Sequence, residues 1–242
     1  MKVLAIGNSF SQDAMRYLHR LAKANGDEVK TVNLYIGGCP LSTHYINMNN
    51  DSAAYDFEFN GERTGIKVSI RQALQSDCWD VVTLQQASHE STFHDKYTPY
   101  IERLAEYVRY HAPKAKIMIH QTWAYEQGSE RLTGLMDYSD QADMYSDIKN
   151  AYNRAAESIN ADGIIPSGQT LQNLLSAGIE KVHRDTFHAS LGLGRYALAL
   201  TWYEMLTGKT DNSFNDFDEP VSEAEKEIAR EAVHKAISEY KK

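Results

Sequence analysis

Short apolar runs alternate along the chain with longer segments in which apolar residues recur every three or four positions. Short continuous runs are typical of strands buried on both faces of a parallel sheet, and the longer spacing is typical of amphipathic helices. The run Ile66–Ile70 is compatible with a strand or with the start of a helix. The predicted strands are Lys2–Ile6, Thr31–Ile36, Asp80–Leu84, Lys116–His120 and Gly163–Ile165.

Helices are predicted in the longer segments, because their apolar residues fall on one face. Gly26 and Gly208 follow two of these segments and Pro113 follows a third, and such residues close helices. The last helix opens with the capping box Ser222–Glu225. The predicted helices are Ser11–Asn25, a helix from Thr98-Pro99 to the residue before Pro113, Ser139–Asn160, Ser190–Thr207 and a final helix from Ser222.

The alternation of strands and helices continues along the chain without a linker or an internal repeat. This order favours a parallel sheet that is covered by helices on both faces. We therefore expect one domain over residues 1–242 with an α/β fold: a three-layer α/β/α sandwich around a flavodoxin-like, central, parallel, five-stranded sheet. In such sheets, ligands bind at the carboxyl ends of the strands.

The charge balance narrows the range of partners. The chain has 33 acidic and 25 basic residues, which gives a formal net charge of -8. A negative protein is poorly suited to nucleic acid or to an anionic membrane, and no apolar run is long enough to cross a bilayer. We expect neither of these partners, whereas a small-molecule or carbohydrate ester is compatible with the charge.

The first residues bear on the location of the protein. The apolar run Met1–Ile6 is too short for the apolar core of a signal peptide, and no cleavage site follows it. The run is better interpreted as the first strand. We expect a cytoplasmic protein, or a periplasmic or secreted one if a leader has been removed.

Candidate chemistry lies at two places far apart in the sequence. Ser9 follows the first predicted strand, and Asp185 and His188 stand three residues apart near the other end. A serine, an imidazole with an ordinary pKa of about 6.5 and a carboxylate can supply the nucleophile, the base and the orienting group of acyl transfer. Structural alternatives exist: Ser9 can be a turn residue before the helix cap Ser11, and the Asp–His pair can cap the following helix.

Acyl transfer also needs fixed hydrogen-bond donors for the oxyanion. Gly37-Gly38 follows the second predicted strand, and glycine lets the backbone approach a ligand closely, so the N–H groups of Gly38 and Ser9 are candidates. Gln85 and Gln86 follow the third strand, and a side-chain amide can also point at an oxyanion. The alternatives are a plain Gly-Gly turn and a structural role for the glutamines.

Other segments resemble metal-binding or dinucleotide-binding motifs, but their spacing or their position along the chain does not match those motifs. The histidines around Asp185, and the pair His89 and His94, could bind a metal, but neither set has the spacing of a zinc motif. Gly192–Ala197 has the glycine spacing of a dinucleotide-binding loop, but it follows no strand and lies in a helical pattern. We therefore expect no metal and no other cofactor.

The chain resembles the SGNH (GDSL-type) hydrolase superfamily over Lys2–Gly208. It is most similar to a bacterial branch of acylhydrolases that is known as a domain of unknown function. Three segments carry the resemblance: Gly7-Asn8-Ser9-Phe10-Ser11 is similar to the first block of the superfamily, Gly37-Gly38 to the second, and Asp185-Thr186-Phe187-His188 to the Asp-x-x-His of the fifth.

The resemblance implies a serine esterase with Ser9 as nucleophile, His188 as base and Asp185 as the residue that orients the imidazole. The third block, usually Gly-x-Asn-Asp, is absent, and Gln85 stands near the position of its asparagine, as in a related group of carbohydrate acetylesterases. We therefore expect Ser9, Gly38 and Gln85, the first residue past its strand, in the oxyanion hole. A non-catalytic carbohydrate-binding domain and a metal-dependent hydrolase remain alternatives.

The expected substrates are O-acyl esters, above all O-acetyl esters, of carbohydrates or similar small molecules. Aromatic residues beyond strand ends can stack on sugar rings, and Tyr35, Trp123 and Tyr125 occupy such positions. We expect Trp123 to contact the substrate.

Overall fold

Five parallel strands form the centre of the sheet. In the computed structural model, which describes residues 1–240, the predicted strands are β1 (Lys2–Gly7), β2 (Lys30–Tyr35), β5 (Val81–Leu84), β6 (Lys116–His120) and β7 (Gly163–Ile165). They pair in parallel in the order β2-β1-β5-β6-β7. The interiors of β1, β2 and β5 are buried on both faces, as continuous apolar runs predict. The α/β class and its mostly parallel sheet are therefore confirmed.

Two antiparallel strands extend this sheet, and neither was predicted in full. The ambiguous run Ile66–Ile70 contains the end of the second of them and the first residue of the helix that follows. β3 (Tyr55–Phe59) and β4 (Glu62–Val68) form a hairpin beside β2, so the sheet has seven strands in the order β4-β3-β2-β1-β5-β6-β7. β4 is exposed along nearly its whole length and lacks the apolar run of a buried strand. The turn Asn60-Gly61, with positive φ at both residues, is the sequence signal that could have revealed the hairpin. The expected five-stranded sheet is thus only the parallel part.

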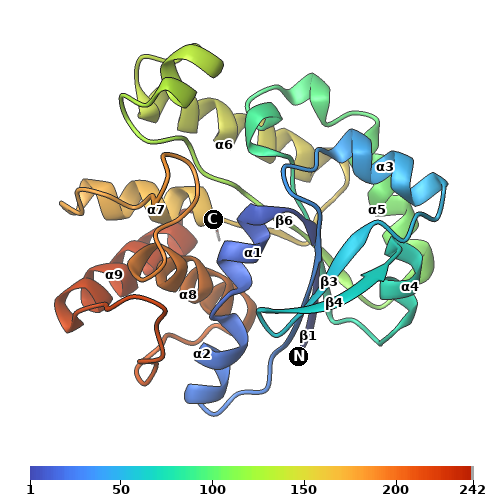
Figure 1. Cartoon of the computed structure of the whole chain (residues 1–242), viewed down its shortest axis with the longest axis horizontal. Helices are drawn as coiled ribbons and strands as arrows, with labels where there is room; N and C mark the ends of the chain where they lie inside the picture. Colours follow the sequence, from blue (N-terminus) through green and yellow to red (C-terminus); the bar gives the residue numbers. More distant parts are fainter. Residues whose placement is uncertain (241–242) are drawn as a thin grey trace.

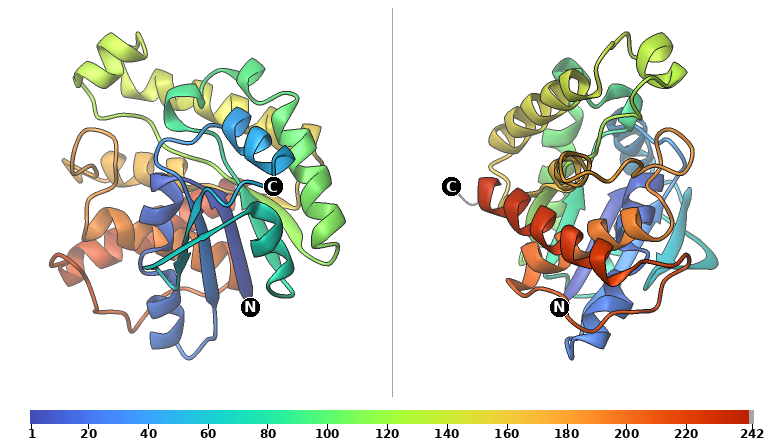
Figure 2. Two further views of the ribbon diagram at one scale, coloured as in Figure 1. Left: turned by 45° about the vertical axis from the view of Figure 1, so that its right-hand side comes forward. Right: turned by 90° about the vertical axis from the view of Figure 1, so that its left-hand side faces the viewer.

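Helices cover both faces of the sheet, which gives the three layers (Figures 1 and 2). No helix within residues 1–240 is both long and apolar enough to cross a membrane. One layer contains α1 (Ser9–Met15), α2 (Leu18–Ala24), α7 (Ser167–Ser176), α8 (Leu193–Thr207) and α9 (Glu223–Tyr240). The other contains α3 (Leu41–Asn49), α4 (Ile70–Gln75), α5 (Tyr100–His111) and α6 (Gln141–Ser158). Short turns in the loops are η1 (Ser88–Glu90), η2 (His94–Lys96) and the π-helical η3 (Arg131–Leu135).

Helix ends differ from the prediction where packing decides them. The first predicted helix is in fact α1 and α2, which are separated at Arg16–Tyr17, where the buried Tyr17 ring packs on two phenylalanines. α8 begins at Leu193 rather than at Ser190, whose hydroxyl accepts a backbone N–H of the first helical turn. α5, α6 and α9 lie within predicted segments, whereas α3, α4 and α7 were not predicted.

Candidate active site

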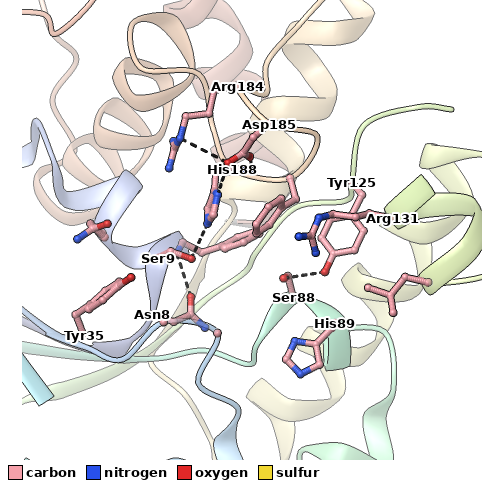
Figure 3. Close-up of a pocket in the computed structure, with 16 residues that line it drawn as sticks. Asn8, Ser9, Tyr35, Ser88, His89, Tyr125, Arg131, Arg184, Asp185 and His188 are labelled. Carbon is pink, nitrogen blue, oxygen red and sulfur yellow. Dashed lines mark hydrogen bonds and ion pairs between the residues drawn. The ribbon is translucent and has the colours of Figure 1, made fainter. Parts of the chain in front are cut away.

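Ser9, His188 and Asp185 form one hydrogen-bonded chain (Figure 3). The Nε2 atom of His188 lies 2.8 Å from Ser9 Oγ, and its Nδ1 atom lies 2.8 Å from Asp185 Oδ2. Ser9 begins α1 at the carboxyl end of β1, and the other two residues lie in the loop between α7 and α8. Residues that are 179 positions apart in the sequence thus meet at the sheet edge where ligands bind in α/β folds.

Asn8 caps the helix that begins at Ser9. The Asn8 side-chain oxygen accepts the N–H of Phe10 at 3.0 Å, and the Ser11 hydroxyl accepts the N–H of Asn8 at 3.0 Å. This reciprocal pair is a capping box with Ser11 at its third helical position, so the interpretation of Ser11 as the cap is wrong. Because Asn8 is the cap, Ser9 stands at the positive end of α1 with its hydroxyl free for His188.

The loop that carries Asp185 and His188 is a closed turn. His183 and Ala189 form an isolated antiparallel bridge, and the N–H of Arg184 donates to the His188 carbonyl at 3.0 Å. The Asp185 carboxylate accepts the backbone N–H of His188 at 2.9 Å as well as the ring nitrogen. The Asp-x-x-His spacing therefore lets one carboxylate fix both the backbone and the ring of the histidine.

The ionisation of Asp185 sets the tautomer of the neighbouring imidazole. Partial burial raises the pKa of this carboxyl group, but hydrogen bonds from the ring and the backbone of His188 act in the opposite sense and leave the pKa below its ordinary value. An ionised Asp185 accepts the Nδ1–H of His188, so the Nε2 lone pair faces the Ser9 hydroxyl. The arrangement can accept a proton from Ser9.

Ser9 and Gly38 line the same cavity. The N–H of a first helical residue has no partner within its helix, and the Gly38 N–H donates to no acceptor among residues 1–240. Gly38 has a φ of +62°, the left-handed region that favours glycine. The Asn8 amide donates to the Cys39 carbonyl at 3.3 Å, which ties this turn to α1. Both N–H groups are therefore without an acceptor among residues 1–240 and remain candidate donors to an oxyanion.

Gln85 does not reach the cavity, which contradicts its expected place in the oxyanion hole. Its Nε2–H donates to Asn8 Oδ1 at 2.8 Å, and its Oε1 accepts the Nδ1–H of His120 at 2.8 Å. Burial lowers the pKa of His120 to about 3, so this ring is neutral and its Nε2 accepts the Ser167 hydroxyl at 3.0 Å. This buried series of hydrogen bonds occupies both the oxygen and the nitrogen of the Gln85 amide, and it fixes the helix cap Asn8.

Gln86 is occupied inside the protein as well. Its Oε1 accepts the N–H of Leu41 at 2.9 Å, at the start of α3, and its Nε2 donates to the Lys96 carbonyl at 2.9 Å. Neither glutamine is therefore placed as a third oxyanion donor. The structural role, which the sequence left open as the alternative for these glutamines, is the one that the structure shows.

A cavity of about 590 Å³ opens beside Ser9, with aromatic side chains in its wall. Tyr35 and Tyr125 line it, but Trp123 does not. Only 1% of the Trp123 surface is exposed, its ring stacks on Phe10 at 4.1 Å, and its Nε1–H donates to the Phe187 carbonyl at 2.7 Å. The expectation that Trp123 contacts substrate is wrong, because Trp123 supports the aromatic wall from behind.

Asp13 joins α1 to the loop that carries His188, and the sequence analysis missed it. Its carboxylate is fully buried and accepts hydrogen bonds from Arg184 Nη1 at 2.9 and 3.0 Å and from Arg195 Nε at 2.9 Å. It also accepts the N–H of Ala189 at 3.2 Å. Asp13 lies one helical turn after Ser9, and a charged residue at that spacing is the signal that could have identified it. These bonds hold the nucleophile and base at a fixed separation.

The histidines considered as metal ligands lie in separate environments. His89 lines the cavity, whereas His183 is buried with its Nε2 on the Ala124 carbonyl at 3.0 Å. Among the residues that the structure describes, histidines, cysteines and carboxylates form no group of three or more that could hold a metal ion.

Solved structures show which class of protein has this fold. A candidate SGNH hydrolase from Slackia heliotrinireducens has 24% identity and a TM-score of 0.62, covering 84% of this chain and 97% of its own. An acetyl xylan esterase has 16% identity and a TM-score of 0.55, covering 84% of this chain and 98% of its own. The fold is that of the SGNH-type hydrolases, as the sequence motifs predicted.

The family of the chain follows from similarity along nearly its whole length. The chain belongs to the family called Domain of unknown function (DUF4886), whose model matches residues 2–236. A crystal structure of a DUF4886 family protein from Bacteroides uniformis has 38% identity and a TM-score of 0.92, covering 98% of this chain and 95% of that chain. No curated protein matches this chain.

Proposed function

We propose that this protein is a serine esterase that removes O-acyl groups, above all O-acetyl groups, from carbohydrates or similar small esters. The observation that carries the proposal is the chain from Asp185 through His188 to Ser9, with 2.8 Å at both contacts and with an open cavity beside the serine. A nucleophile, a base and an orienting carboxylate in this order are the components of covalent acyl transfer.

The reaction has two halves. Ser9 Oγ attacks the ester carbonyl carbon while His188 Nε2 takes the hydroxyl proton, and the oxyanion faces the N–H groups of Ser9 and Gly38. The C–O bond to the alcohol then breaks, and His188 returns the proton to the departing oxygen. Water, deprotonated by His188, attacks the acyl carbon of the acyl-enzyme. The bond from this carbon to Ser9 Oγ then breaks, His188 returns the proton to Oγ, and the carboxylic acid leaves. Asp185 stabilises the imidazolium in both halves.

The size and the lining of the cavity support a small acyl group on a sugar-like alcohol. A volume of about 590 Å³ is within the usual range for small-molecule sites. Tyr35 and Tyr125 line the cavity and give it aromatic surface against which a pyranose can pack. The acetyl xylan esterase of the same fold is named for this kind of substrate, which favours acetate as the acyl group.

Covalent trapping tests the proposed nucleophile. A fluorophosphonate ester should add once to the native protein, and peptide mapping should place the adduct on Ser9, because His188 activates this hydroxyl. Ser88 lines the same cavity, so Ser88→Ala is the matched control and should still be labelled, whereas Ser9→Ala should not. Labelling of Ser88 in place of Ser9 would contradict the proposal.

A further inference from the structure

One arginine in the cavity wall, Arg131, has no carboxylate partner in the part of the chain that the structure describes. Arg131 begins the η3 turn and lines the cavity, and Figure 3 shows its side chain beside Tyr125, across the cavity from Ser9. Its guanidinium carbon lies 3.9 Å from the centre of the Phe187 ring. Stacking on a ring face fixes the plane of the guanidinium and leaves its N–H edge available.

The contrast with the second arginine of the cavity wall is informative. Arg184 donates from Nη1 to the Asp13 carboxylate and to the Ala189 carbonyl, so its charge is paired with a buried carboxylate. Arg131 forms no ion pair with any carboxylate among residues 1–240, although the chain has a net charge of -8. Asp185, the carboxylate in the cavity wall, is held by His188. The Arg131 guanidinium is therefore available to a ligand in the cavity.

The position of Arg131 indicates which half of an ester it would meet. Phe187, on which Arg131 stacks, also packs on the His188 ring, with 3.8 Å between the ring centres. His188 donates a proton to the oxygen of the departing alcohol. The alcohol half of the ester therefore lies on the His188 side of the scissile bond. In the proposed reaction, the oxyanion instead faces the N–H groups of Ser9 and Gly38. Arg131 is therefore close to the alcohol half.

We propose that Arg131 binds a carboxylate on the alcohol half of the substrate, so that the preferred substrates are O-acyl esters of acidic sugars or of similar hydroxy acids. A planar guanidinium matches a carboxylate with two parallel hydrogen bonds, which a neutral hydroxyl cannot reproduce. This inference rests on the proposed esterase function and adds the charge of the substrate to it.

Two matched pairs of aryl esters test the proposal. In the first pair, 3-acetoxybenzoate and methyl 3-acetoxybenzoate, the carboxylate is present or blocked on the alcohol half. In the second pair, phenyl hydrogen succinate and phenyl butyrate, the charge is present or absent on the acyl half. The kcat/KM ratio of the charged to the neutral ester is measured for native protein, Arg131→Met, Arg131→Lys and Arg154→Met. Arg154 is exposed on α6 outside the cavity, so its variant controls for net charge.

In Arg131→Met, the ratio for the first pair should fall about tenfold, mainly through KM, as expected for loss of a charge-assisted hydrogen bond. In Arg131→Lys, the first-pair ratio should fall by less than in Arg131→Met. In Arg154→Met, the first-pair ratio should be the same as in native protein. The ratio for the second pair should not move in any variant. Because each ratio is compared between proteins, the intrinsic reactivity of the esters cancels.

Other results would overturn the proposal in distinguishable ways. Native protein that cleaves the neutral esters, with first-pair ratios equal in native protein and Arg131→Met, would refute the role of Arg131 alone. A change confined to the second pair would place the charge on the acyl half and also refute it. No turnover of any of the four esters by native protein would refute the proposed esterase function, and this inference with it.

Discussion

At the scale of single residues, Gln85 acts on the site through the Asn8 helix cap and the buried His120. Two amides after a buried strand identify a polar position at the functional edge of the sheet. The direction of each amide depends on His120 and Asn8, which lie on other segments of the chain. Ser9, Asp185 and His188 could be named because their residue types and spacing are informative without knowledge of neighbours, whereas an amide fits several roles.

Gln85→Ala should lower stability and kcat together. The change leaves the buried Nδ1–H of His120 without its acceptor and frees the Asn8 side chain, so the free energy of unfolding should fall by about 1–3 kcal/mol. Urea unfolding and steady-state kinetics on the folded protein measure both effects. An unchanged stability with kcat lower by ~10²–10³ would instead identify Gln85 as a direct oxyanion donor.

At the scale of elements, the buried parallel strands are clear in the sequence, whereas only the Asn60-Gly61 turn indicates the edge hairpin. β1 and β5 are buried on both faces, so burial imposes a continuous apolar run on each of them. β4 is exposed, so little in its composition separates it from a loop. The break between α1 and α2 was also unpredictable, because it depends on the packing of Tyr17 against residues nearly 200 positions away.

The contact between α1 and the His188 loop gives a prediction at the same scale. Asp13→Asn removes the charge that holds Arg184 and Arg195, so the loop should lose its fixed distance from Ser9 and kcat should fall about tenfold or more. The same change should lower the free energy of unfolding by about 3 kcal/mol, because it breaks a buried ion pair. Kinetics are measured well below the melting temperature, with the folded fraction followed by circular dichroism.

A matched variant separates positioning from stability in this test. Asp218 pairs with Arg16 and Arg195 on the outer side of the same network and has no bond to the His188 loop. Asp218→Asn should therefore destabilise the protein without lowering kcat. Equal losses of kcat in the two variants would show that general loosening, rather than the Asp13 contact, controls the reaction.

At the scale of the whole molecule, buried histidines make stability depend on pH. Burial lowers the pKa of His44 and of His120 to about 3, against about 6.5 in the unfolded chain. Between these values the unfolded state binds more protons, so stability is present above pH 6.5 and is lost as the pH falls. The free energy of unfolding should drop by about 2 kcal/mol per buried histidine between pH 7 and pH 5.

Urea unfolding at a series of pH values measures this dependence. His120→Gln removes one titrating group and should flatten the slope between pH 7 and pH 5, whatever its effect on stability at pH 7. His89 is exposed and serves as the control, so His89→Gln should keep the native slope. If the free energy of unfolding of His120→Gln depended on pH as steeply as that of the native protein, the neutral state assigned to His120 would be contradicted.

The central claim is that Ser9 is the nucleophile of an ester hydrolase. Its most direct test is hydrolysis of p-nitrophenyl acetate by native protein and Ser9→Ala, each with and without a chelator. We predict turnover by native protein that chelator leaves unchanged, and a loss of at least ~10³ in kcat in Ser9→Ala, because no other group replaces the covalent step. Turnover that survives in Ser9→Ala would contradict the account.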